Sequence, residues 1–230
     1  MALHFGFLVF PKVQQLDLTG PYEIFATLPG ANVHMVWKDR SAVMSATGLP
    51  LTPTTTFAEC PALDVLCVPG GIGVNALLED AETLAFLRAQ AARVRYLTSV
   101  CTGSLVLGAA GLLDGRRATT HWFSHDFLPR FGAVPVHARV VRDGNLITAG
   151  GVTAGVDFAL TVVAELAGRE QAEAIQLALE YSPETPFRAG TPDEAPPAVL
   201  ATAKARLAPG RAAREAIIDR LIGSSAAKAV

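Results

Sequence analysis

Residues 94–110 read VRYLTSVCTGSLVLGAA and are the most informative part of the chain. The apolar run that ends at Val100 predicts a buried strand, and the small residues from Thr102 to Ala110 predict a helix. Cys101 lies between them, so we expect a strand–turn–helix that lifts its side chain above the end of a sheet. Because the positive end of a helix favours an anion, this position predicts a partly ionised, nucleophilic thiol.

Strand and helix patterns alternate along the rest of the chain. Apolar runs predict strands at residues 5–10, 33–37, 64–69, 94–100, 136–142 and 146–149, with short hairpin-like strands within 43–57. Helical patterns cover residues 17–28, 80–93, 102–110, 153–166 and 170–180. We expect Pro21 in the first turn of the first helix, with Asp17 or Thr19 as its cap. Repeated strand–loop–helix units imply an α/β fold, a mostly parallel sheet with helices on both faces.

The composition and charge of the chain indicate a globular protein and argue against some classes of partner. The chain has 230 residues, of which 50% are hydrophobic and 17% charged, which is typical of a globular protein. Its net charge of −2 and the lack of a basic stripe argue against a nucleic-acid partner. No apolar run is long enough to cross a membrane, and no signal peptide is evident, so we expect no membrane partner and a cytoplasmic protein.

The cysteine count agrees with a reducing compartment. Three cysteines are an odd number in a sizeable chain, which argues against a disulfide framework. Cys67 falls within an expected strand and Cys60 precedes a proline, so we interpret both as ordinary small core or loop residues. Cys101 is the one whose local sequence indicates chemistry.

Three segments that follow different strands are expected to converge. Asp17, the glycines of residues 70–73 and the Cys101-Thr102 pair would meet at the carboxyl ends of the strands, where doubly wound sheets hold their sites. Asp17 is either a helix cap or a carboxyl group that passes protons. The glycines either form a turn or let backbone N–H groups approach a developing negative charge. They do not complete a dinucleotide-binding fingerprint.

His121 and His125 are spaced one helical turn apart. That spacing can hold a metal ion, but no third ligand is indicated, and we expect no metal site. His121 could instead act as a general base for Cys101. The simplest interpretation is that both histidines are structural.

Several motifs together resemble the ThiJ/PfpI superfamily. They are FGFLVFP at residues 5–11, PGG at residues 69–71 and SVCTGS at residues 99–104. Further segments are similar to the isocyanide hydratases within it, namely VQQLDLTGP at 13–21, TSVCTGSLVLGAAGLL at 98–113, RATTHW at 117–122 and VVRDGNL at 140–146. The resemblance covers about residues 3–182 and, less firmly, the tail.

The resemblance implies a flavodoxin-like three-layer sandwich with a cysteine nucleophile elbow. It implies a catalytic domain over residues 1–182, with a proline-rich wrap and helical tail, residues 183–230, belonging to the same domain. Residues 198–222 themselves predict either a helix pair or a tail. A homodimer is also implied, and no metal or organic cofactor is required.

The implied activity is the hydration of isocyanides to N-substituted formamides through a covalent thioimidate. Cys101 corresponds to the family's nucleophile, Asp17 to its acidic partner and Thr102 to the residue after the nucleophile. Backbone N–H groups near Gly71 and Ile72 would steady the charged sulfur and the intermediate. Many superfamily peptidases carry histidine directly after the cysteine, so Thr102 argues against peptidase activity.

Two other functions use the same cysteine. One is a glyoxalase or deglycase type of enzyme acting on reactive aldehydes. The other is a non-enzymatic redox sensor, since an exposed elbow thiolate oxidises readily. Related transcriptional regulators add a helix-turn-helix region after such a domain, but too little chain follows residue 182 here for a pair of these motifs.

Overall fold

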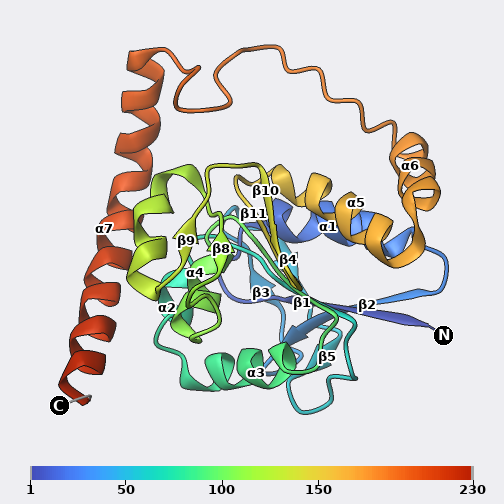
Figure 1. Cartoon of the computed structure of the whole chain (residues 1–230), viewed down its shortest axis with the longest axis horizontal. Coiled ribbons are helices and arrows are strands. Elements are labelled where there is room, and N and C mark those ends of the chain that lie inside the picture. The colour runs from blue at the N-terminus through green and yellow to red at the C-terminus, as the bar shows by residue number, and fades with distance from the viewer. Residues whose placement is uncertain (1, 229–230) are drawn as a thin grey trace.

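A seven-stranded sheet forms the centre of the molecule. The computed structural model describes residues 2–228 (Figure 1). The strand order is β10-β11-β7-β6-β1-β2-β5. The strands are β1 (Leu3–Leu8), β2 (Ala31–Trp37), β5 (Thr55–Thr56), β6 (Val65–Val68), β7 (Tyr96–Val100), β10 (Val140–Asp143) and β11 (Leu146–Ala149). Every pairing is parallel except that of β10 with β11, which confirms the mostly parallel sheet.

Helices cover both faces of this sheet. On one side, α1 (Gln15–Ala26) packs against α5 (Ala154–Ala167), which also contacts α6 (Arg169–Ala178). On the other side lie α2 (Val74–Leu77), α3 (Ala81–Ala91) and α4 (Gly103–Ala109), as Figure 1 shows. The predicted three-layer α/β sandwich is therefore confirmed.

The C-terminal segment differs from a helix pair. One helix, α7 (Pro197–Lys228), stands beside α2 and the 3₁₀ helix η1 (Trp122–Phe131), after an extended connection (Figure 1). Pro209 lies inside α7 without ending it. Ile218 is fully buried, so α7 is held by apolar packing as well as by its own backbone bonds.

Two details of the first helix were predicted wrongly. The helix begins at Gln15, two residues earlier than expected, so Pro21 lies in its interior rather than in its first turn. Gln14 occupies the N-cap position, and neither Asp17 nor Thr19 caps the helix. The reason is that the Asp17 side chain is buried and accepts a hydrogen bond from another loop, that of Gly70. The helix predicted over residues 80–93 is observed as α3, and Asp80 caps it, because its side chain accepts the Thr83 N–H.

Two pairs of short strands form separate two-stranded sheets. β3 (Val43–Met44) pairs with β4 (Pro50–Leu51) in the expected hairpin, while β5 joins the edge of the main sheet. β8 (Arg117–Ala118) pairs with β9 (Val134–Pro135), a pairing that the sequence did not indicate.

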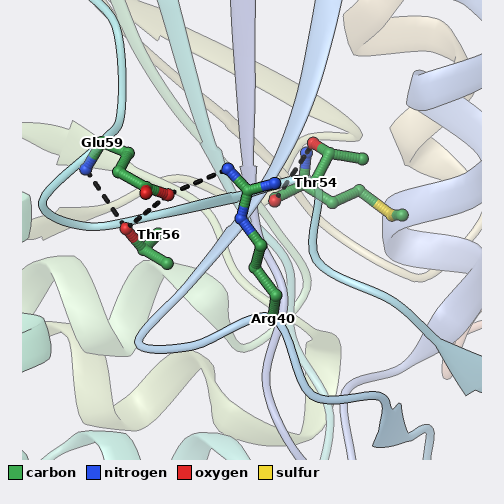
Figure 2. Close-up of polar contacts among 5 residues, drawn as sticks. Arg40, Thr54, Thr56 and Glu59 are labelled. Carbon is green, nitrogen blue, oxygen red and sulfur yellow. Dashed lines mark hydrogen bonds and ion pairs between the residues drawn. The ribbon is translucent and has the colours of Figure 1, made fainter.

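The edge strand β5 is tied to neighbouring loops by exposed polar contacts. Figure 2 shows Arg40 paired with Glu59 at 2.9 Å, while the Thr56 hydroxyl donates to the same carboxylate at 3.1 Å. The Glu59 N–H in turn donates to the Thr56 hydroxyl. These contacts fix the edge of the sheet and include no residue of the cavity described below.

Aromatic packing positions α1 on the sheet. The Phe25 ring stacks on Phe5 of β1 with centroids 4.4 Å apart, and its edge meets Phe158 of α5 at 6.0 Å. All three side chains are fully buried. This cluster fixes the helix whose first turn carries Asp17. Within residues 2–228, no helix has the length and apolar character needed to cross a membrane.

Candidate active site

Cys101 lies in the turn between β7 and α4. Its φ is 54°, in the left-handed region that costs a residue with a side chain about 1–3 kcal/mol. The surrounding chain holds this conformation: the Cys101 N–H donates to Ala149 O at 3.0 Å, and its carbonyl accepts the Thr120 hydroxyl at 3.0 Å. The geometry is consistent with the expected nucleophile elbow.

Asp17 is the acidic group beside this cysteine. It is fully buried, and its Oδ2 accepts the Gly70 N–H at 2.8 Å. Burial raises the pKa of Asp17 to about 7, while the Gly70 N–H and the Cys101 side chain act in the opposite direction. A carboxyl group with such a pKa exchanges protons readily at neutral pH. Of the two interpretations of Asp17, the structure excludes capping, because Gln14 holds the N-cap position, and proton transfer stays a prediction.

The Cys101 thiol does not have the lowered pKa expected from its place at a helix start. Burial raises its pKa well above the ordinary value, and the Asp17 carboxylate raises it further. The Thr102 N–H, the Thr102 hydroxyl and Arg214 act in the opposite direction without overcoming burial. Helix α4 has only seven residues, so its N-terminus offers limited compensation. The resting sulfur is therefore a thiol. An acceptor must take the thiol proton before the sulfur can act as a nucleophile.

The glycine loop after β6 lies directly against this pair. A Cβ on Gly70 would be 2.6 Å from Thr102 N and 2.8 Å from Asp17 Oδ2, so no side chain fits there. The Gly71 N–H donates to the Thr102 hydroxyl at 3.1 Å and is already engaged. Among the described residues, the Ile72 N–H has no hydrogen-bond acceptor. The loop thus does more than turn the chain, because its backbone orders Asp17 and Thr102.

A cavity of about 240 Å³ opens onto the sulfur. Four predicted residues line it: Gly71, Ile72, Cys101 and Thr102. Asp17 is not among the lining residues and lies buried behind them. The site residues that the sequence did not indicate are Gln14, Ala46, Phe123, Ser124, Val152, Leu207, Gly210, Arg211 and Arg214.

Four of these residues come from α7. Leu207, Gly210, Arg211 and Arg214 line the cavity from the C-terminal helix, a segment that was expected as a helix pair or a tail and not as part of the site. No motif marked them, because an Ala- and Arg-rich helix gives no local indication of the side that will meet a distant loop.

His121 and His125 make different contacts. His121 lines the cavity, and its Nδ1 accepts the Phe123 N–H at 3.3 Å; burial is the main cause that lowers its pKa to about 4. His125 contacts the Thr119 hydroxyl through Nε2 and stacks on His137, with centroids 4.0 Å apart. Over residues 2–228, no cluster of three or more His, Cys, Asp or Glu side chains is arranged to hold a metal.

The other two cysteines lie outside the site. Cys67 is fully buried in β6, and Cys60 is partly buried in a loop. Burial raises the pKa of both thiols, to about 11 for Cys60. They have the surroundings of packing residues, as the sequence suggested.

Known proteins share this fold and most of this sequence. The sequence profile of the DJ-1/PfpI family matches residues 5–165. An isonitrile hydratase of Pseudomonas putida is 63% identical over 220 residues, which are 96% of this chain and 96% of that protein. The crystal structure of a ThiJ/PfpI family protein from Pseudomonas syringae superposes with a TM-score of 0.92 at 47% identity, covering 95% of this chain and 91% of that one.

A more distant relative has a different role. The HTH-type transcriptional regulator GbdR of Pseudomonas aeruginosa is 33% identical over 178 residues, and the match covers 74% of this chain but only 48% of the regulator. The full-length similarity is thus to the hydratase and not to the regulator. With its parallel sheet, its cysteine turn and these matches, this chain belongs to the DJ-1/PfpI family.

Proposed function

We propose that this protein is an isocyanide hydratase, which converts R–N≡C and water to the N-substituted formamide R–NH–CHO. The observation that carries the proposal is the buried Asp17–Cys101 pair at the cavity. The near full-length similarity to the isonitrile hydratase of Pseudomonas putida supports the substrate class.

In the first step, Cys101 attacks the terminal carbon of the isocyanide. The Asp17 carboxylate takes the thiol proton while the sulfur forms a bond to that carbon. Asp17 then returns the proton to the same carbon, which gives the thioimidate R–N=CH–S–Cys101. The pKa near 7 of Asp17 suits both the acceptance and the donation of this proton. Covalent attachment divides one difficult hydration into two easier steps.

In the second step, water releases the product. Asp17 takes a proton from water as the oxygen adds to the thioimidate carbon, and it passes this proton to the nitrogen, which gives R–NH–CH(OH)–S–Cys101. The C–S bond then breaks as Asp17 transfers the hydroxyl proton to the departing sulfur, so that R–NH–CHO forms and the Cys101 thiol is restored. Every atom of the isocyanide and of one water molecule appears in the product, so the reaction needs no oxidant or reductant.

The neighbouring residues support these charges. The Thr102 N–H and hydroxyl stabilise negative charge on the sulfur. Gly71 orients the Thr102 hydroxyl by donating its N–H to it, and the Ile72 N–H remains to stabilise the intermediate. The apolar side chains of Phe123, Val152 and Leu207 give an uncharged substituent a suitable surface.

We also propose a domain arrangement, an oligomeric state and a cellular location for this protein. We place residues 183–230 in the same domain as residues 1–182, because α7 contributes to the cavity. A homodimer follows from the family resemblance, and light scattering of the purified protein would measure its mass. The three unpaired cysteines support a cytoplasmic location.

Turnover of p-nitrophenyl isocyanide, followed by absorbance and by mass spectrometry of the formamide, tests the proposal. Wild type should turn over, and Cys101→Ala should not. Cys60→Ala is the matched control, because it removes a free thiol outside the cavity. Activity retained by Cys101→Ala would contradict the covalent mechanism. Turnover of methylglyoxal without isocyanide turnover would favour the aldehyde enzyme, and peroxide oxidation of Cys101 without any turnover would favour the sensor.

A further inference from the structure

Arg214 is a buried cation without an anionic partner. Only 6% of its surface is exposed, and its hydrogen bonds go to neutral groups: Nε donates to Asn75 Oδ1 at 2.9 Å and Nη1 to Ser124 Oγ at 3.1 Å. No ion pair of Arg214 exists within the described part of the chain. Buried charges are normally paired, so a buried guanidinium without an anionic partner is unusual and indicates a role for its charge.

Two other arginines of α7 are paired. Arg211 forms an ion pair with Asp126 at 2.6 Å, and Arg220 forms one with Glu79 at 3.0 Å. Both attach α7 to the rest of the molecule. Arg214 lies between them in the sequence and is bound through an amide and a hydroxyl instead. Its charge is held in place without being neutralised.

That charge faces the reactive sulfur. Arg214 lines the same cavity as Cys101 and interacts electrostatically with it. Asp17 of α1 is buried outside the cavity lining, and Arg214 is not among the groups that influence its pKa. When the proton moves from Cys101 Sγ to Asp17, the S–H bond breaks and an O–H bond forms. Negative charge thereby moves toward Arg214.

The other groups around the cavity do not supply this charge. His121 has its pKa lowered to about 4 and is neutral at physiological pH. Arg211 is compensated by Asp126, and the Thr102 hydroxyl is uncharged. Among the described residues that line the cavity, Arg214 alone offers an uncompensated positive charge.

We propose that Arg214 is a positioning residue whose fixed charge stabilises the Cys101 thiolate formed when Asp17 accepts the proton. Asn75 of α2 and Ser124 of η1 hold the guanidinium in the required place. The C-terminal helix then completes the site rather than merely covering it. The importance of Arg214 for isocyanide hydration rests on the proposed function, but its stabilisation of the Cys101 thiolate does not.

Alkylation of Cys101 by iodoacetamide measures this effect without any isocyanide. The rate of modification, followed by mass spectrometry of the Cys101 peptide against pH, reports the thiolate population. Arg214→Gln should lower the rate near neutral pH by about tenfold, the equivalent of one pKa unit, and move the pH midpoint upward. Arg214→Lys should restore part of the rate. In turnover, kcat should fall with little change in KM.

Two further variants separate charge from structure. Arg220→Gln removes an exposed ion pair of the same helix and should leave the alkylation rate unchanged. Asn75→Asp keeps Arg214 in place but gives it a carboxylate partner, so it should also slow alkylation. This second variant gives an answer even if Arg214→Gln does not fold.

Several results would overturn the proposal. One is an unchanged iodoacetamide rate in folded Arg214→Gln or in Asn75→Asp. Another is an equal loss in Arg220→Gln, which would indicate a general loosening of α7. A loss confined to the anionic reagent iodoacetate would mean that Arg214 attracts anions and does not tune the thiol. If wild type fails to turn over isocyanide while Arg214→Gln still slows alkylation, only the proposed function fails.

Discussion

Burial raises the pKa of both residues in the central pair. The Asp17 carboxyl reaches about 7, and the Cys101 thiol lies well above its ordinary range. Near neutral pH a substantial fraction of the molecules therefore combine an ionised Asp17 with a protonated Cys101. This combination is the starting state for the proposed attack of the Cys101 sulfur on the isocyanide, since the base and the thiol proton are already adjacent.

Asp17→Asn tests the role of the carboxylate. The amide oxygen can still accept the Gly70 N–H, but it cannot take a proton from sulfur. We expect kcat to fall by about 10²–10⁴, the usual contribution of a positioned general base. Steady-state kinetics beside wild type would check this. Undiminished turnover would mean that Asp17 has only a structural role.

The same residue predicts a pH dependence of stability. The folded-state pKa of about 7 exceeds the ordinary carboxyl value of 3.8, so the folded state binds more protons between these values. The contribution of Asp17 to stability must therefore decrease as pH rises from about 4 to about 7. Asp17→Asn should gain stability relative to wild type over this range. Urea denaturation of both proteins near pH 5 and near pH 8 measures the difference, and a constant difference would contradict the raised pKa.

Gly70→Ala tests the close contact between the glycine loop and the pair. The added methyl would lie 2.6 Å from Thr102 N and 2.8 Å from Asp17 Oδ2, so the loop must shift. We expect a stability loss of about 1–3 kcal/mol and a marked loss of activity. Gly151→Ala is the matched control, because its Cβ would meet nothing within 4 Å. Equal effects in both variants would exclude a specific role for Gly70.

Among the elements, α1 has the greatest influence on the site. It carries Asp17 in its first turn, and the stacked rings of Phe25 and Phe5 hold it on the sheet. The position of Asp17, the proposed proton acceptor, thus depends on apolar packing two turns away. A change in that packing alters the position of Asp17 without replacing any residue of the site.

Phe25→Ala should lower the free energy of unfolding by about 3–5 kcal/mol, the usual cost of removing a buried ring. Thermal or urea unfolding would measure it. Leu177→Ala on α6 is the control, since that side chain is 80% exposed and should change stability by less than about 0.5 kcal/mol. Similar losses in both variants would argue against the Phe25 cluster as the anchor of α1.

At the scale of elements, the sequence predicted what local patterns can encode. The β7–α4 unit and the last two strands of the sheet, β10 and β11, were expected near their observed places, because apolar runs mark them directly. The start of α1 was misplaced because the buried Asp17 resembles a cap residue in sequence alone. The pairing of β8 with β9 joins distant segments and leaves no periodic pattern.

At the scale of the whole molecule, the site was predicted only in part. Cys101, Thr102, Gly71 and Ile72 were placed together because they follow adjacent parallel strands. Arg214 was missed, since its partner Asn75 lies 139 residues away and no motif links them. The raised pKa of Cys101 was also missed, because burial is a property of the folded chain rather than of the elbow.

The proposed mechanism requires a covalent bond between Cys101 and the isocyanide carbon. The most direct measurement is rapid acid quenching of wild type during turnover of p-nitrophenyl isocyanide, followed by mass spectrometry of the intact protein and of the Cys101 peptide. We predict a transient mass gain equal to one whole isocyanide molecule, located on Cys101 and absent from Cys101→Ala. Turnover by wild type without any adduct on Cys101, together with turnover by Cys101→Ala, would contradict the account.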